Sequence, residues 1–331
     1  MSISPLQVAI IGAGLAGLSC AQHLHQAGYA VKLFDKARGV GGRLSTRRTE
    51  TTSFDHGAQY FTARDPDFCA QVALWQQQGV ASRWDQPLMA YQLGQWSAVA
   101  DQPRYVGVPR MNAIARQMCA ELPCELSHRL LSLHRVGDQW HLQFEGDFPS
   151  VIADQVVLAI PAPQVLDLLA ESHPFYAIAQ SIRMQPTWAV MLELAHAVDV
   201  PYAGAFINDQ TCLSWIAQNH RKPARTSVPT WVLHSAPAWA SQHADAEPSW
   251  VAAQMIAEFE QVLGQPVHIK QQMVHRWLYA LAEQPLMQQS LYDAHLRLGI
   301  AGDWLCGSRV EGAWCSGQYV AQSIMATRAV A

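Results

Sequence analysis

The feature that most constrains this chain is a glycine-rich turn close to its N-terminus. An apolar run at 7–11 leads into Gly-Ala-Gly-Leu-Ala-Gly at 12–17, a helical stretch follows, and a second apolar run at 30–34 ends at Asp35. This is the GxGxxG pattern in a strand–turn–helix–strand setting. Its glycines permit a tight turn, the approach of a pyrophosphate and close packing of the helix on the strand. The pattern predicts a parallel α/β sheet that binds a dinucleotide, with Asp35 accepting hydrogen bonds from a ribose.

A second glycine-rich stretch favours FAD over NAD as that dinucleotide. Residues 38–43 read Arg-Gly-Val-Gly-Gly-Arg, so more backbone can approach a cofactor, and Arg43 adds a cation suited to a diphosphate. Near the C-terminus, 298–303 read as a short strand that ends in Gly-Asp, and a final helix opens at 311–317. The positive end of such a helix dipole would stabilise an anionic reduced flavin.

Three blocks carry a resemblance to a known family. They span 33–43, 54–65 and 306–314. In these blocks the chain resembles the flavin amine-oxidase superfamily with its GG doublet, and within it the bacterial renalase branch. The resemblance implies an α/β fold in which a Rossmann-type FAD-binding domain is interleaved with an α+β substrate domain, in the topology of p-hydroxybenzoate hydroxylase and the amine oxidases.

The motifs and the resemblance together predict the cofactor contacts. We expect them in the first glycine turn, the acid that follows it, the second glycine pair, the block around residue 59 and the C-terminal strand and helix. The expected residues are Gly12, Ala13, Gly14, Leu15, Ala16, Gly17, Asp35, Lys36, Gly41, Gly42, Arg43, Gln59, Tyr60, Gly302, Asp303, Glu311, Gly312 and Ala313. Relatives with covalently bound flavin would offer a cysteine within 275–280, and this chain has none there. Non-covalent FAD is therefore expected.

The chain is expected to form two interleaved domains. Its 331 residues, half of them apolar, can bury a sizeable core. We expect the FAD-binding domain to comprise 1–65, 105–163 and 284–331. The substrate domain would then comprise 66–104 and 164–283.

Composition argues against several classes of function. The net charge of −4 and the lack of a basic run give no attraction to nucleic acid or acidic lipid. No apolar stretch is long enough to span a bilayer, so no membrane association is expected. Seven cysteines without a CxxC pair fit the reduced thiols of a cytoplasmic protein. The histidines are scattered without metal-ligand spacing, so no metal site is expected.

The resemblance also implies a substrate. Amine oxidases of this superfamily usually carry a lysine near flavin N5, at the start of a substrate-domain strand, but the corresponding stretch at 185–190 has none. The renalase branch implies instead isomers of NAD(P)H that carry the hydride at ring position 2 or 6. Loss of hydride from such a ring gives an aromatic pyridinium directly, so no general base is needed. The electrons would pass to O2, giving NAD(P)+ and hydrogen peroxide.

Four residues are predicted to bind that small-molecule dinucleotide. Tyr60 and Trp277 could supply aromatic walls for a flat ring, and His234 and Asn219 could hydrogen-bond its carboxamide. For each there is a structural alternative: a core aromatic, a buried core histidine, or an asparagine that caps a turn. A basic cluster at 221–225 would attract phosphates or simply form a solvated loop.

Two other functions stay open at this point. The first is an FAD-dependent amine oxidase or desaturase of the same superfamily, which would be favoured if Lys270 lay over the flavin. The second is a flavoprotein whose FAD is structural and whose role is to bind a partner. The density of cofactor motifs at both ends of the chain argues against the second.

Overall fold

A computed structural model describes residues 6–209 and 211–328 of the chain. Its first sheet has six strands in the order β19-β20-β13-β1-β2-β9. All neighbours in it are parallel except β19 and β20. The six strands are β1 (Gln7–Ile11), β2 (Ala30–Asp35), β9 (Cys124–Leu126), β13 (Gln155–Leu158), β19 (Leu291–Asp293) and β20 (Leu298–Ile300). The predicted parallel α/β sheet is confirmed, and it takes strands from both ends of the chain.

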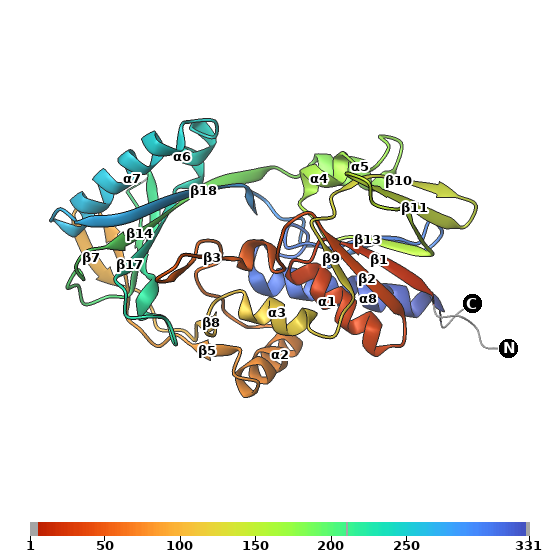
Figure 1. Ribbon diagram of the computed structural model, residues 1–331, viewed down its shortest axis with the longest axis horizontal. Helices are drawn as coiled ribbons and strands as arrows, with labels where there is room; N and C mark the ends of the chain where they lie inside the picture. The colour runs from red at the N-terminus through yellow and green to blue at the C-terminus, as the bar shows by residue number, and fades with distance from the viewer. Residues whose placement is uncertain (1–5, 210, 329–331) are drawn as a thin grey trace.

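Each face of this sheet has its own cover (Figure 1). The helices α1 (Leu15–Gln26) and α8 (Val310–Arg328) lie on one face, where Val8, Ile10 and Leu33 join their core. Ala9 and Ile11 point to the other face and pack under a three-stranded sheet. That sheet contains β10 (Leu130–Val136), β11 (Gln139–Phe144) and β12 (Val151–Ala153). The near-continuous apolar runs of β1 and β2 reflect this burial on both faces.

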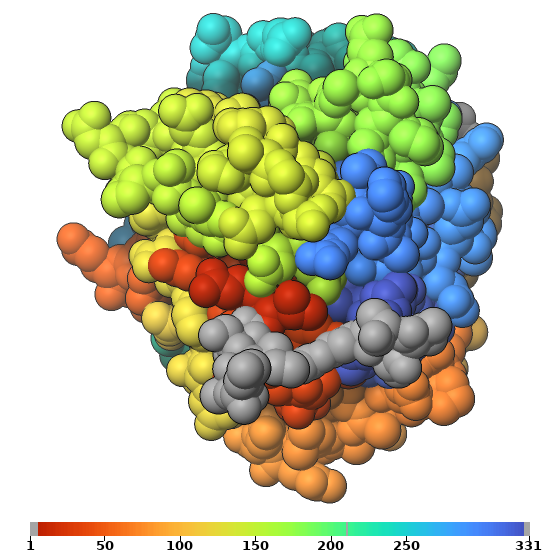
Figure 2. Space-filling model, turned by 90° about the vertical axis from the view of Figure 1, so that its right-hand side faces the viewer, coloured from red at the N-terminus to blue at the C-terminus, as the bar shows by residue number. Residues whose placement is uncertain are grey.

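Segments from near the two ends of the chain pack against each other on the first sheet. Figure 2 shows the first strand and helix (red) beside the C-terminal segments (blue). Ser19 on α1 donates a hydrogen bond of 2.8 Å to the carbonyl of Trp314 on α8. A Cβ on Gly317 would lie 2.1 Å from the carbonyl oxygen of Ala16, so the two helices approach to a distance that only glycine allows.

A second, seven-stranded sheet forms the opposite end of the molecule (Figure 1). Its order is β18-β14-β17-β16-β15-β6-β7, with β6 and β15 parallel and the other neighbours antiparallel. The strands are β6 (Leu88–Gln92), β7 (Gln95–Ala98), β14 (Met184–Leu194), β15 (Gly204–Ile207), β16 (Leu213–Gln218), β17 (Thr230–Ser235) and β18 (Ile269–Ala282). The helices α6 (Pro237–Gln242) and α7 (Pro248–Leu263) cover one of its faces.

The alternation of side chains along these strands separates a core face from a site face. Trp188, Leu192 and Trp231 pack with Phe259 of α7 in one apolar cluster. The alternate positions form a row across the other face, because His275 pairs with Ala189, Ala189 with His234, and His234 with Trp215. This face looks toward the chain segment at 54–60, whose residue Phe54 packs on Met191 and Val232.

The shorter elements link the two sheets. The remaining helices are α2 (Pro66–Gln77), α3 (Ala113–Cys119), α4 (Ala162–Leu166), α5 (Pro174–Gln180) and the 3-10 turns η1 (Gly42–Leu44) and η2 (Asn219–Arg221). The remaining strands are β3 (Thr46–Arg48), β4 (Ser53–Asp55), β5 (Ala81–Arg83) and β8 (Tyr105–Gly107). In the described part of the chain, no helix is both long enough and apolar enough to cross a membrane.

The helix α2 packs differently from the strands β6 and β7 of the same segment, 66–104. The rings of Phe68 on α2 and Trp314 on α8 lie 5.5 Å apart. Asp67 of α2 also accepts a hydrogen bond of 2.9 Å from Gln318 of α8. The strands β6 and β7 belong instead to the seven-stranded sheet. The proposed domain division thus places in the substrate domain one helix that packs on the first sheet's cover.

Candidate active site

The first glycine turn has the shape that a bound pyrophosphate needs. Gly12 has φ +107°, and a Cβ there would lie 2.4 Å from the carbonyl oxygen of Ala159. A Cβ on Gly17 would lie 1.9 Å from the carbonyl oxygen of Gly12. Around Gly14, in contrast, no atom lies within 4 Å of the Cβ position. Two of the glycines are thus required by the fold, and the third keeps a backbone surface open at the start of α1.

The second glycine pair lies against the first turn. The N–H of Gly41 donates a hydrogen bond of 2.8 Å to the carbonyl of Ala13. Gly41 and Gly42 have φ +116° and +52°, a backbone that favours glycine. The Cβ position of Gly42 meets only the Cα of Gly14, at 3.4 Å. Two stretches of backbone without side chains therefore lie side by side, as a dinucleotide site requires.

Asp35 holds these turns in place. Its carboxylate accepts hydrogen bonds of 2.7 Å from the N–H groups of Ala13 and Ala37. Burial raises the pKa of Asp35, and these two backbone N–H groups oppose the rise. A carboxylate has further lone pairs, so it could still accept from a ribose hydroxyl. Lys36 beside it is exposed.

Arg43 joins the second glycine turn to the C-terminal strand. Its guanidinium makes a two-armed ion pair with Asp303, at 2.9 and 2.5 Å, and donates a hydrogen bond of 2.8 Å to the carbonyl of Ala280. From the sequence, Arg43 and Asp303 were expected to contact the cofactor separately. In the structure they contact each other, and this pair joins the second glycine turn to the segment after β20.

The N-terminal end of α8 is held against the block at 54–65. Oε1 of Glu311 accepts the backbone N–H groups of Arg64 and Asp65, at 2.5 and 2.8 Å. A Cβ on Gly312 would lie 2.0 Å from the carbonyl oxygen of Cys306, so this turn also needs glycine. Ala313, the last predicted cofactor contact, is half-buried in the same helical turn. The open backbone at Gly14, the paired glycine turns and this helix end together fit FAD.

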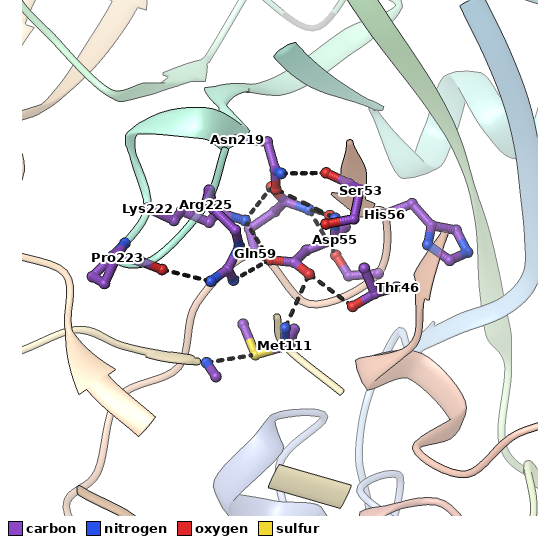
Figure 3. Close-up of polar contacts among 12 residues, drawn as sticks. Thr46, Ser53, Asp55, His56, Gln59, Met111, Asn219, Lys222, Pro223 and Arg225 are labelled. Atoms are coloured by element: carbon purple, nitrogen blue, oxygen red, sulfur yellow. Dashed lines mark hydrogen bonds and ion pairs between the residues drawn. The ribbon is translucent and has the colours of Figure 1, made fainter. Parts of the chain in front are cut away.

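A buried charge cluster joins the end of β4 to the segment that follows η2 (Figure 3). The side chains of Asp55, Lys222 and Arg225 are at most 3% exposed. Oδ2 of Asp55 lies 2.5 Å from Nη2 of Arg225 and 3.6 Å from Nζ of Lys222. Its Oδ1 accepts hydrogen bonds of 2.8 Å from the Thr46 hydroxyl and 3.0 Å from the Met111 N–H. The two cations and the backbone N–H lower the pKa of Asp55 to about 2, against the rise that burial alone would cause.

The structure contradicts both predictions for the basic residues at 221–225. They form neither a solvated loop nor a free phosphate-attracting mouth. Lys222 and Arg225 are neutralised in part by Asp55, and Arg221 donates to the carbonyls of Val200 and Tyr202, at 3.3 and 3.1 Å. Burial lowers the pKa of Lys222 to about 8, although Asp55 opposes this.

Gln59 and Asn219 make fixed contacts around the cluster. Gln59 accepts a hydrogen bond of 3.2 Å from Lys222 at Oε1, and its amide nitrogen donates to the carbonyls of Asp55 and Gly57. Asn219 is 1% exposed. Its amide donates to the carbonyl of Ser53 at 2.8 Å and accepts the N–H of Asp55 at 3.3 Å. Both polar atoms of Asn219 are thus engaged by β4.

Imidazole and indole rings gather at the junction of β17 and β18 with the loop at 56–57. Nε2 of His234 lies 3.0 Å from the carbonyl oxygen of His56, which also accepts the indole N–H of Trp277 at 2.9 Å. The ring of His56 stacks on Trp277, with centroids 5.0 Å apart, and meets the edge of His275 at 4.8 Å. In Figure 3 the His56 ring points away from the charge cluster.

These imidazoles are neutral at pH 7. Burial lowers the pKa of His234 to about 4, and burial together with the neighbouring His275 lowers that of His56 to about 3. Since Nε2 of neutral His234 donates to the His56 carbonyl, Nδ1 is left as an acceptor. Within the described residues, that nitrogen has no hydrogen-bond partner.

Tyr60 begins a second aromatic group on the site face. Its ring lies 5.6 Å from Trp215 and 6.1 Å from Trp84, and the guanidinium of Arg104 lies 5.6 Å from its centroid. The structure therefore places Tyr60 and Trp277 at the same sheet face but in separate groups, on either side of His234 and Gln59.

Lys270 does not belong to the site. Its side chain is 61% exposed and pairs with Glu193 at 2.7 Å, toward the end of β14 remote from Thr187. Asp55, His56 and His275 were not predicted as site residues, and Lys222 was predicted only as part of a basic cluster that would attract phosphates or form a solvated loop. Asp55 and His56 lie in the block at 54–65 that carries the family resemblance, which was the available signal for them.

Comparison with known proteins agrees with this architecture. Residues 10–75 match the model of an NAD(P)-binding Rossmann-like domain, and residues 74–325 match that of the flavin containing amine oxidoreductases. A cyclohexylamine oxidase from Brevibacterium oxydans IH-35A has the same fold, with a TM-score of 0.77 over 98% of this chain and 99% of that chain, at 12% identity.

Curated relatives match over short segments. A 4,4'-diaponeurosporene oxygenase from Staphylococcus haemolyticus is 40% identical over 60 residues, which are 18% of this chain and 12% of that protein. An L-amino-acid oxidase from Notechis scutatus scutatus is 48% identical over 48 residues, 14% of this chain and 9% of that protein. The match thus spans only about a tenth of these relatives' length.

The second family model covers most of the chain, and the solved structure shares the fold along nearly its whole length. The glycine turns and the end of α8 fit the cofactor of that family. The chain therefore belongs to the flavin containing amine oxidoreductase family, and it is an FAD-dependent oxidoreductase.

Proposed function

We propose that this protein oxidises the 2- and 6-dihydro isomers of NAD(P)H, a metabolite-repair reaction. The ring loses a hydride and becomes a pyridinium, so that isomer, O2 and one proton give NAD(P)+ and hydrogen peroxide. The chemistry that FAD supplies is acceptance of the hydride at N5 and transfer of the electron pair to O2. The bound FAD is proposed to be non-covalent.

The observation that carries this proposal is that neither His56 nor His234, two imidazoles that lie beside each other at the site, is a competent base at pH 7. The lowered pKa values of His56 and His234 make both imidazoles weak proton acceptors at pH 7. Oxidation of an alkylamine requires loss of the ammonium proton before or during hydride transfer. Oxidation of a dihydronicotinamide does not, because the charge appears on the ring nitrogen without loss of a proton.

His234 supports the same substrate class through its free acceptor. Neutral Nδ1 suits the NH2 group of a carboxamide, which an ordinary amine substrate lacks. Trp277, held by its indole N–H to the His56 carbonyl, offers a fixed aromatic surface beside it. The site therefore has to orient such a substrate, and it does not have to supply an acid or a base.

One observation favours amine oxidation or desaturation as the second candidate. Lys222 is a buried lysine at the site face, and its pKa of about 8 lies below the ordinary range. At pH 7, however, Lys222 is still mostly protonated, and Asp55 and Gln59 engage its ammonium group. Because most of it already holds its proton at neutral pH, Lys222 is largely unavailable as a base for amine oxidation.

The test is anaerobic mixing of the yellow protein with 2- and 6-dihydro-NAD(P), ordinary 4-dihydro-NAD(P)H and a panel of primary and secondary amines. We expect rapid flavin bleaching by the 2- or 6-isomers alone, and one peroxide per turnover after air is readmitted. Bleaching by an amine, with the isomers inert, would overturn the proposal.

A matched pair of variants tests the role of His234. His234→Leu should raise KM for the isomers about tenfold or more, since it removes the proposed carboxamide acceptor. His25→Leu, at an exposed position on α1, should leave KM unchanged.

A further inference from the structure

The buried cluster of Asp55, Lys222 and Arg225 carries an unbalanced charge. It contains two cations and one carboxylate, and all three side chains are buried. Within the described residues, neither cation lies within 4.0 Å of a second carboxylate. Since a buried charge without a counter-charge is costly, the excess positive charge needs a reason.

The other contacts of the cluster do not supply an anion. Lys222 donates to the neutral Gln59 amide, and its Nζ lies 5.8 Å from the centroid of the Trp84 ring. Arg225 donates to the carbonyl of Pro223, and its buried Nε has no hydrogen-bond partner. The hydroxyl and N–H that reach Asp55 are donors, which further offset its negative charge.

The cluster is separated from the cofactor turns by a single stretch of chain. Gln59, which Lys222 binds, follows Ala58, whose N–H donates 2.9 Å to the carbonyl of Arg43 in the second glycine turn. A Cβ on Gly57 would lie 2.0 Å from the same carbonyl oxygen, so the two stretches are in direct contact. No ionised side chain lies in 56–60, since His56 is neutral. The excess positive charge of the cluster therefore acts on the second glycine turn through the protein interior, which screens charges less than water does.

We propose that the excess positive charge of Lys222 and Arg225 over Asp55 is a built-in counter-charge for the negative charge that two-electron reduction adds to the bound cofactor. The cluster thereby raises the reduction potential of the site. In this role Lys222 is a positioning and electrostatic residue that moves no proton. The proposal holds for any hydride donor and so goes beyond the proposed substrate.

The experiment measures the midpoint potential of the flavin-loaded protein by slow reduction with xanthine and xanthine oxidase against a reference dye. Lys222→Met should lower the equilibrium constant for two-electron reduction at least tenfold, which is about 30 mV. Lys222→Arg keeps the charge and should stay within about threefold of the wild type. Lys270→Met, which removes an exposed lysine outside the site, should leave the potential unchanged.

Two results would overturn the proposal. One is an unchanged potential in Lys222→Met with full flavin content. The other is an equal drop in Lys222→Met and Lys222→Arg, which would assign the effect to the Gln59 hydrogen bond instead of the charge. If Lys222→Met does not fold, Arg225→Gln removes the same unit of charge and is measured in its place. Because no dihydronicotinamide is used, failure of the proposed substrate leaves this result interpretable.

Discussion

At the scale of single residues, Asp55 has the largest expected effect on stability. It is the one carboxylate that partners both Lys222 and Arg225 in the described structure, and it also accepts from Thr46 and Met111. Asp55→Asn leaves two buried cations without a counter-charge, so we expect a loss of about 3–5 kcal/mol in the free energy of unfolding. Urea denaturation measures it. Asp85→Asn, in an exposed pair with Arg83, is the control and should change stability by less than about 0.5 kcal/mol.

The buried histidines predict that the free energy of unfolding falls at acidic pH. The pKa of His234 falls from 6.5 in the unfolded chain to about 4 in the folded protein. Below pH 6.5 the unfolded state therefore binds the proton first, and stability is lost as the pH falls toward 4. The contribution of His234 is on the order of 3 kcal/mol between pH 7 and pH 4.

Urea denaturation at several pH values checks this contribution. The His234→Gln variant should lose less stability between pH 7 and pH 4 than the wild type does. His25→Gln, at an exposed site, should follow the wild-type slope. Parallel slopes for His234→Gln and the wild type would contradict the prediction. Asp55 does not interfere, because its pKa moves from 3.8 to about 2 and its contribution is lost at lower pH.

At the scale of elements, we expect substitutions at different glycines of the first turn to affect protein stability and cofactor binding separately. Gly17→Ala places a Cβ 1.9 Å from the carbonyl oxygen of Gly12 and forces α1 away from β1, so we expect a loss of about 2–3 kcal/mol in the apoprotein. Gly14→Ala fills open space and should leave apoprotein stability within about 0.5 kcal/mol of the wild type.

FAD affinity should show a different pattern. Gly14→Ala should weaken FAD binding about tenfold or more, since the new methyl group stands where the pyrophosphate is expected. Flavin fluorescence titration measures the affinity. Gly39→Ala is the control, because Gly39 is exposed and also has no neighbour within 4 Å of its Cβ position. If Gly14→Ala retained full affinity, the dinucleotide would have to lie elsewhere.

The same elements show how far the sequence predicts the structure. The strand–turn–helix unit at 7–35 is local, and its signals lie within a few residues of each other, so it was predicted correctly. The charge cluster joins Asp55 to Lys222 and Arg225, which lie more than 160 residues away. Nothing in the local composition of 221–225 distinguishes a buried cation from a surface one. Likewise, the pairing of Arg43 with Asp303 depends on the two ends of the chain meeting in one sheet.

At the scale of the whole molecule, the cofactor site is assembled from both ends of the chain. The glycine turns come from β1, α1 and η1, while Asp303 and Glu311 come from the turn after β20 and from α8. These segments are joined by the ion pair of Arg43 with Asp303 and by the contacts of Glu311 with Arg64 and Asp65. FAD bound there would add further contacts between these elements, so its removal should lower the stability of the whole fold.

This arrangement predicts that FAD is removable and stabilising. No cysteine lies within 275–280 for a covalent bond, so acid precipitation should leave a colourless pellet and a yellow supernatant. A ligand that binds only the folded state at a hundredfold excess over its Kd adds about 2.7 kcal/mol to the free energy of unfolding. For a chain of this size, that corresponds to a rise in Tm of several degrees. Differential scanning calorimetry of the apoprotein, with and without added FAD, measures the rise. A pellet that stays yellow, or an apoprotein whose Tm ignores added FAD, would contradict a dissociable cofactor that ties the two ends of the chain together.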